Sequence, residues 1–194
     1  MWRRSAWGGL VGPLAFVGAW ALGGVITSHE YSPVHDTISR LAAVDAPTRW
    51  LMTSGMIVFG VALLAYAIPL RRALAGPSWI AAGATGAATL GVAATPLDRS
   101  DLVDGLHLVA AGIGYLTLAA IPVLAFRPLL AAGRRGLAVF GATMAVVAVA
   151  ALPISLVVAE SGLFQRLGLT AGDLFLVASV PSVRSILAGT SSGP

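Results

Sequence analysis

Two histidine–carboxylate pairs and an arginine share one short polar segment, and they are His29, Glu30, His35, Asp36 and Arg40. A carboxylate can orient an imidazole as a general base, and both groups can bind a metal. We therefore consider His35 and Asp36 as metal ligands. Arg40 could hold a substrate phosphate. The spacing matches no established zinc motif, so the metal hypothesis rests on residue types alone.

The same segment has an alternative interpretation without chemistry. It could be a loop or short amphipathic helix at the membrane surface, with Tyr31 at the depth of the lipid headgroups. Ile38 and Leu41 would then dip into lipid. This second interpretation is the one that the sequence favours.

A second polar segment runs from Asp98 to His107. Asp101, Asp104 and His107 are spaced three residues apart, so they share one face of a helix. His107 lies below the membrane surface in this arrangement and should face the bundle interior or a wet cavity. A neutral histidine there could accept a proton or bind a metal, with Asp98 beside it. For Asp101 and Asp104 the simpler interpretation is interaction with the helix N-terminus.

A third polar segment contains Glu160, Arg166 and Asp173. Arg166 could pair with Glu160 or bind a phosphate headgroup. If the last helix began at Arg166, Asp173 would lie about 10 Å deep at 1.5 Å per residue. The sequence favours the alternative, in which Thr170 is the N-cap and Asp173 completes a capping box.

The composition excludes several classes of function. Of the 194 residues, 57% are hydrophobic and only 10% are charged, and the mean hydropathy is +0.88. Such a chain belongs in a membrane, because water could not solvate so much apolar surface. The sequence contains no cysteine, which excludes disulfides and thiolate chemistry. The net charge of +4 comes from scattered arginines, so we expect membrane lipid as a partner and no nucleic acid.

Six apolar runs can position these polar segments. Each is close to the length of about 20 residues that crosses a bilayer. They predict an all-α fold, a polytopic membrane bundle of about six helices in one domain over residues 1–188, with a disordered tail at 189–194. The first run could instead be a cleaved signal peptide, although five more runs follow it. The runs are 10–28, 50–70, 78–97, 105–126, 137–159 and about 171–187.

The arginines predict the orientation. With six spans, eight arginines fall on the side of both termini and four on the other side, so the positive-inside rule places both termini in the cytoplasm of an inner-membrane protein. All eight acids and three histidines fall on the opposite, extracytoplasmic side. The eight arginines are Arg3, Arg4, Arg71, Arg72, Arg127, Arg134, Arg135 and Arg184.

The run at 78–97 is rich in alanine and glycine. Small residues on every face allow close helix contact, so we expect this helix at the centre of the bundle. It is also a surface through which another protein could bind.

Three motifs in order resemble the domain of unknown function 998 (DUF998) family of small six-helix bacterial membrane proteins. The first is Tyr-Ser-Pro at 31–33 followed by Thr-Ile-Ser-Arg-Leu-Ala at 37–42. The second is Thr-Pro-Leu-Asp at 95–98 with Gly-Leu-His at 105–107, where threonine replaces the family's usual aromatic residue. The third is Gly-Leu-Phe-Gln-Arg at 162–166.

The resemblance implies six helices and singles out Ser39, Asp98, His107 and Arg166. It implies no reaction, cofactor or substrate. One hypothesis is a lipid-directed hydrolase or transferase with His107, Asp98 and Ser39 as catalytic residues and Arg166 and Arg40 as substrate-binding residues. On this hypothesis His107, His35 and Asp36 are the metal candidates. The alternatives are a non-catalytic lipid-binding or partner protein and a small transporter, which would need ionisable groups near the middle of the membrane.

Overall fold

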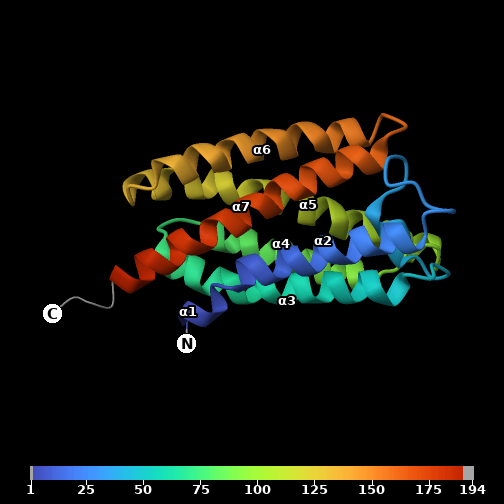
Figure 1. Cartoon of the computed structure of the whole chain (residues 1–194), viewed down its shortest axis with the longest axis horizontal. Coiled ribbons are helices and arrows are strands. Elements are labelled where there is room, and N and C mark those ends of the chain that lie inside the picture. The colour runs from blue at the N-terminus through green and yellow to red at the C-terminus, as the bar shows by residue number, and fades with distance from the viewer. Residues whose placement is uncertain (1, 190–194) are drawn as a thin grey trace.

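The computed structural model describes residues 2–189, and every regular element in that range is a helix (Figure 1). The tail at 190–194 lies outside the described residues, and Gly189 is the last residue of the final helix. The elements are α1 Trp2–Ser5, α2 Gly8–Ile26, the 3₁₀ helix η1 Ile38–Ala42, α3 Arg49–Ala73, α4 Ser78–Ala94, α5 Asp101–Ala131, α6 Arg135–Ser155 and α7 Ser161–Gly189.

Five of the described helices, α2, α3, α5, α6 and α7, are long and apolar enough to cross a membrane. The sixth apolar helix, α4, has 17 residues, which reach roughly 25 Å at 1.5 Å per residue. Large apolar side chains such as Val25, Leu108 and Val146 are mostly exposed on the outside of the bundle. Lipid can cover such a surface, so the predicted polytopic membrane bundle is confirmed.

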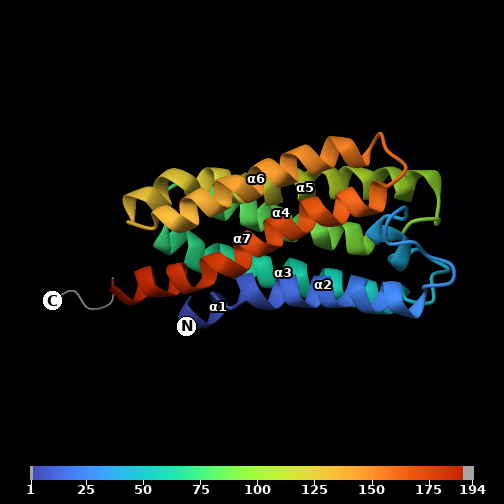
Figure 2. The ribbon, with the colours of Figure 1, turned by 45° about the horizontal axis from the view of Figure 1, so that its top comes forward.

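Short connections make neighbouring helices antiparallel. Gly76 and Gly133 adopt φ values of +101° and +71° in the turns before α4 and α6, a conformation that glycine reaches without strain. We call the end with residues 27–48, 95–100 and 156–160 the loop end. The opposite, terminal end holds α1 and the end of α7 (Figures 1 and 2).

Helix α7 crosses the bundle diagonally and contacts α2, α3, α5 and α6 (Figure 2). Its buried residues join a core that also includes the Phe16 and Phe59 rings, whose centroids are 5.3 Å apart. The hydroxyl groups of Tyr66 and Ser179 lie 2.6 Å apart and link α3 to α7 inside this core.

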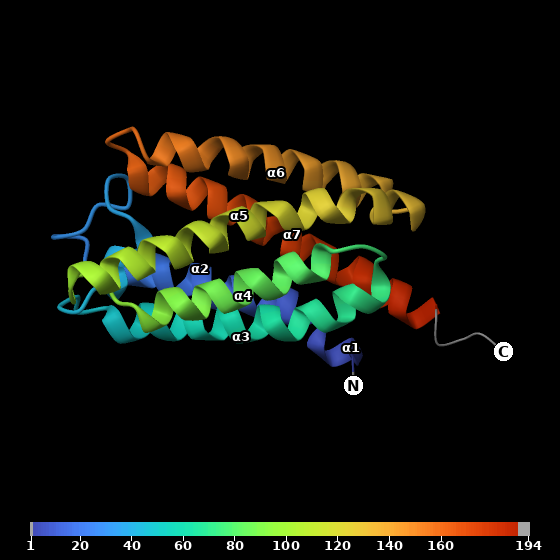
Figure 3. The same cartoon turned by 180° about the vertical axis from the view of Figure 1, so that it is seen from behind.

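Helix α4 corrects one prediction. It packs between α3 and α5 and is not the central helix (Figure 3). The close approach expected of its small residues is present, because a Cβ on Gly86 would lie 2.6 Å from the carbonyl oxygen of Gly60. Small residues therefore let α4 approach α3 without burying it in the middle of the bundle. A role of this helix in binding a protein stays a prediction.

The start of α7 corrects a second prediction. The helix begins at Ser161, so the capping box proposed for Thr170 and Asp173 is wrong. Asp173 lies twelve residues inside the helix, roughly 18 Å from its start. It therefore does not belong with the acids of the loop end.

Candidate functional site

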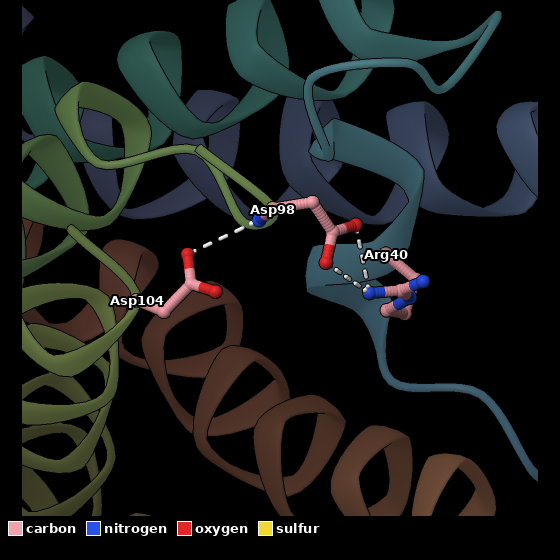
Figure 4. Close-up of polar contacts among 3 residues, drawn as sticks. All are labelled: Arg40, Asp98 and Asp104. Atoms are coloured by element: carbon pink, nitrogen blue, oxygen red, sulfur yellow. Dashed lines mark hydrogen bonds and ion pairs between the residues drawn. The ribbon is translucent and has the colours of Figure 1, made fainter. Parts of the chain in front are cut away.

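Arg40 and Asp98 form an ion pair at the loop end. Nη1 of Arg40 lies 3.0 Å from one carboxylate oxygen of Asp98 and 2.9 Å from the other (Figure 4). Arg40 comes from η1 and Asp98 from the connection between α4 and α5. Both side chains are about half exposed, at 50% and 47%. The pair is therefore accessible to a ligand.

Asp98 holds an uncommon backbone conformation. Its φ of 64° lies in the left-handed region, which aspartate tolerates better than most residues. Its backbone N–H donates to Oδ1 of Asp104 at 3.1 Å (Figure 4). Ser100 caps α5 by accepting from the N–H of Val103, and Asp101 and Asp104 occupy the first turn, as the capping interpretation expects. This local network directs the Asp98 carboxylate towards Arg40.

A polar depression of about 260 Å³ adjoins the ion pair. Its wall comes from the end of α2, from η1 and from the loops on either side. The charged side chains that line it are mainly acidic, with Arg40 as the one cation among its lining residues. They are Glu30, Asp36, Arg40, Asp45 and Asp98.

Arg166 is buried and bonded to the first loop. Nη1 donates to the carbonyl oxygens of Pro33, Asp36 and Gly162 at 2.7, 3.0 and 2.9 Å. Nη2 donates to the hydroxyl oxygen of Tyr31. These contacts occupy both terminal nitrogens of the guanidinium, whereas Nε is buried without a hydrogen-bond partner in the described residues. The contacts give Arg166 a positioning role at the start of α7.

The loop before η1 is held against α7 by further bonds. The carbonyl of His35 accepts from the Ser161 hydroxyl at 2.7 Å, and Oε1 of Gln165 accepts from the N–H of Ile38 at 2.7 Å. Ile38 and Leu41 are each 1% exposed. The interpretation that they dip into lipid is therefore wrong, because they pack in the protein core.

Tyr31 is buried beneath the same loop. Its hydroxyl lies 3.1 Å from the carbonyl oxygen of Thr37 and 3.3 Å from that of Asp36, and it donates to them. Burial raises the pKa of the phenol above its ordinary value of 10.0, although the nearby Arg166 guanidinium acts in the opposite direction. The phenol thus stays neutral at ordinary pH.

His107 is buried in the second turn of α5, as its spacing predicted. Nδ1 lies 2.6 Å from the carbonyl oxygen of Thr95. A carbonyl only accepts, so Nδ1 carries a proton and donates it to Thr95. Nε2 is buried and has no hydrogen-bond partner among the described residues.

Ser39 lies apart from both Asp98 and His107 in its contacts. It lines an internal cavity of about 60 Å³. The three residues predicted as catalytic therefore take part in three different settings, namely an exposed ion pair, a buried bond to Thr95 and an internal cavity. The other polar side chains of the cavity are Thr85, Thr89, Tyr115 and Gln165.

The metal candidates also have separate contacts. Nδ1 of His35 lies 3.1 Å from the carbonyl oxygen of Ala159, and a carboxylate oxygen of Asp36 accepts from the N–H of Ser32 at 2.8 Å. Within residues 2–189 no three His, Asp or Glu side chains are grouped closely enough to hold a metal ion. The proposed set of His107, His35 and Asp36 is not brought together.

Asp173 is the residue that the sequence interpretation set aside in favour of a capping role. It is 3% exposed, and within residues 2–189 neither carboxylate oxygen has a hydrogen-bond partner. Its position four residues after Leu169 and eight after Gln165 was the available signal, because all three fall on one face of a continuous helix. The local capping pattern concealed it.

Comparison with known proteins identifies the family. A family model described as "Protein of unknown function (DUF998)" matches residues 10–180. No curated protein and no solved structure matches the chain. The match covers most of the chain, including all three motifs and the residues around Arg40, Asp98, His107 and Arg166. The chain is a multi-pass membrane protein that belongs to the DUF998 family.

Proposed function

We propose that this protein binds the headgroup of a zwitterionic phospholipid at its loop end, on the extracytoplasmic side of the inner membrane. The observation that supports this proposal is the exposed ion pair between Arg40 and Asp98 at the edge of a polar depression. A phosphate and an ammonium group on one ligand match the two charges of this pair.

The ion pair is suited to exchange with such a ligand. An exposed pair contributes only about 0–1 kcal/mol, so a ligand can open it at low cost. Both bonds to Asp98 use Nη1 of Arg40, and the other guanidinium nitrogens have no protein partner in the described chain. Arginine forms strong, paired hydrogen bonds with phosphate. Arg40 would hold the phosphate while Asp98 is released to the ammonium group.

The acidic wall favours the cationic half of the ligand. Glu30 and Asp45 are exposed and line the depression beside Asp98. A headgroup with phosphate alone would meet repulsion from these carboxylates. The depression therefore suits a zwitterionic headgroup better than a purely anionic one.

Binding without reaction is the function that the geometry supports best. A hydrolase or transferase would need a nucleophile, a base and a substrate at one point. Ser39 lies at the internal cavity and His107 bonds to Thr95, whereas Asp98 faces Arg40. The contacts of these three side chains therefore give less support to a joint catalytic role than to binding.

The orientation in this proposal follows from the arginines. Arg71 and Arg72 lie in the last turn of α3, Arg134 precedes α6 and Arg135 is its first residue, all at the terminal end. The positive-inside rule places this end in the cytoplasm and the loop end outside.

The test is lipid binding by the purified full-length protein. We would measure retention of phosphatidylethanolamine and of phosphatidylglycerol by native mass spectrometry in detergent micelles. Arg40→Ala should weaken phosphatidylethanolamine binding by about tenfold, the loss of one charge-assisted contact. Arg99→Ala is the matched control, because Arg99 is exposed in the same connection as Asp98 but does not line the depression.

Two results would overturn the proposal. One is equal affinity of the Arg40→Ala and Arg99→Ala variants for phosphatidylethanolamine. The other is release of free ethanolamine from phosphatidylethanolamine vesicles by the native protein but not by His107→Ala, which would indicate an enzyme. Preference for phosphatidylethanolamine over phosphatidylglycerol, lost on changing Arg40, would support it.

A further inference from the structure

An ionisable side chain lies unpaired near the middle of the bundle. Asp173 is the one acid in the described chain that lies beyond the first turn of an apolar helix. Both of its oxygens are buried without a partner. A bare carboxylate is very costly in such a place, so the group must be neutral or have a cation beside it.

The internal cavity lies on the same side of α7 as Asp173. Gln165 and Leu169 line the cavity, and Asp173 follows Leu169 by four residues on that face. Side chains of an α-helix point back towards its N-terminus. Since α7 starts at the loop end, this lean takes the Asp173 side chain towards the loop end and towards the turn that contains Leu169.

His107 lies on the face of α5 that lines the cavity, one turn closer to the loop end than Ala111. It shares a face of α5 with Ala111, Gly114 and Leu118, which all line the cavity. It lies roughly 9 Å from the start of α5, against roughly 18 Å for Asp173 from the start of α7. Its unpartnered Nε2 is the only buried nitrogen of a described histidine without a bond. Two buried titratable groups with unpartnered polar atoms therefore lie on the two helix faces that line this cavity.

The cavity has the size and the lining for water. Its 60 Å³ is enough for roughly four waters at 10–15 Å³ of probe volume each. Hydroxyl and amide groups of Ser39, Thr89 and Gln165 offer partners. A proton needs only a file of waters to cross such a space.

We propose that Asp173 is a proton-binding site in the middle of the membrane that exchanges its proton with the loop end through this cavity and His107. In the step, the Asp173 acid gives its proton to a cavity water and becomes a carboxylate. The water passes a proton to Nε2 of His107, which becomes an imidazolium and releases the proton to solvent at the loop end. The proton-binding site is separate from the lipid site at Arg40.

The other titratable groups around Asp173 are few. Tyr115 of α5 lies within electrostatic range of both Asp173 and Arg166. Tyr66 of α3 is bonded to Ser179. Helices α2 and α6 carry no ionisable group in their middle parts. A carboxyl signal from the membrane interior that depends on pH would therefore come from Asp173.

The experiment is infrared difference spectroscopy of the full-length protein in lipid nanodiscs. A protonated buried acid gives a C=O stretch that shifts in D₂O. We expect this band near neutral pH in the native protein, its loss in Asp173→Asn, and its retention in Asp101→Asn, which removes an exposed acid of the loop end. Absence of the band from the native protein at every pH at which it stays folded would overturn the proposal.

The route is tested by the rate at which the Asp173 acid proton exchanges for deuterium, which the shift of its C=O band reports. Gly114→Leu fills the cavity wall, and Gly112→Leu is its control because a Cβ there meets nothing within 4 Å. Exchange should slow by about tenfold in Gly114→Leu. If that variant does not fold, Ala111→Met obstructs the same wall one turn closer to His107.

His107 is tested in the same way. His107→Gln keeps a donor for the Thr95 carbonyl but has no titratable nitrogen, so exchange should slow while the band stays. Exchange at the native rate in both a folded cavity-filling variant and His107→Gln would overturn the proposed route. Slowing in these variants with no change in Gly112→Leu would support it.

Discussion

Nη1 of Arg166 donates a 2.7 Å hydrogen bond to the carbonyl oxygen of Pro33, a residue 133 positions earlier in the chain. The same atom reaches the carbonyl oxygen of Asp36 in the first loop. A buried cation is thus held by backbone carbonyls and aromatic faces, since Trp20 and Tyr31 also lie beside the guanidinium. This arrangement fixes the loop that forms one wall of the polar depression.

The Arg166 contacts predict that a lysine cannot replace the arginine. Lysine keeps the charge but cannot serve three carbonyls and the Tyr31 hydroxyl from one planar group. We expect Arg166→Lys to lower the free energy of unfolding by about 3 kcal/mol, since buried donors and acceptors lose partners. Thermal unfolding in detergent micelles measures this, with Arg99→Lys as the control. Equal stability of the two variants would contradict the role given to Arg166.

The left-handed backbone at Asp98 predicts an unusual order among substitutions. Both Asp98→Ala and Asp98→Gly remove the ion pair with Arg40. Glycine accepts a φ of 64° without strain, whereas alanine does not. Asp98→Gly should therefore be more stable than Asp98→Ala by about 1 kcal/mol, as chemical denaturation would measure. An alanine variant as stable as the glycine variant would show that the backbone relaxes elsewhere.

The helices were predictable because a long apolar run has few alternatives in a membrane protein. The sequence also favoured a loop or short helix for the segment that contains η1, but the packing of that segment was not predictable. Ile38 and Leu41 are apolar, and an apolar side chain in a surface segment fits lipid as well as a protein core. Their burial depends on bonds to α7, such as that from Ile38 to Gln165, which no local pattern encodes.

Asp173 was misplaced for a related reason. Thr170 and Asp173 satisfy the local rule for a helix start, but the helix already begins at Ser161, whose hydroxyl bonds to His35. The tertiary bonds of the first loop thus override a local capping signal. Asp98 and His107 were recognised as notable from their types and spacing. That Asp98 pairs with Arg40, and that His107 pairs with Thr95, depends on turns whose course the sequence does not specify.

The crossing of α3 and α4 predicts a strong effect of a single methyl group. A Cβ on Gly60 would lie 2.8 Å from the carbonyl oxygen of Gly86, and a Cβ on Gly86 would lie 2.6 Å from that of Gly60. Backbone cannot move aside cheaply, so each change to alanine should cost about 1–3 kcal/mol. Gly105→Ala is the control, because a Cβ there meets nothing within 4 Å and helix propensity favours alanine. A lower melting temperature for Gly105→Ala than for Gly60→Ala in thermal unfolding would contradict the close crossing.

The burial of Tyr31 predicts an alkaline dependence of stability. Its pKa is raised above 10.0 in the folded protein, so the folded state holds the phenolic proton more tightly than the unfolded chain does. The resulting stabilisation is complete below about pH 10 and is lost as the pH rises through the higher folded value. Tyr31→Phe removes this contribution together with the bonds to Arg166 and to the Thr37 carbonyl.

The native protein should therefore exceed Tyr31→Phe in the free energy of unfolding near neutral pH, and the difference should shrink above about pH 10. Denaturant unfolding of both proteins at a series of pH values measures this difference directly. The other tyrosines are present in both proteins, so their titration cancels in the comparison. A difference that stays constant, or grows, as the pH rises past 10 would mean that Tyr31 is not held as the buried neutral phenol beside Arg166.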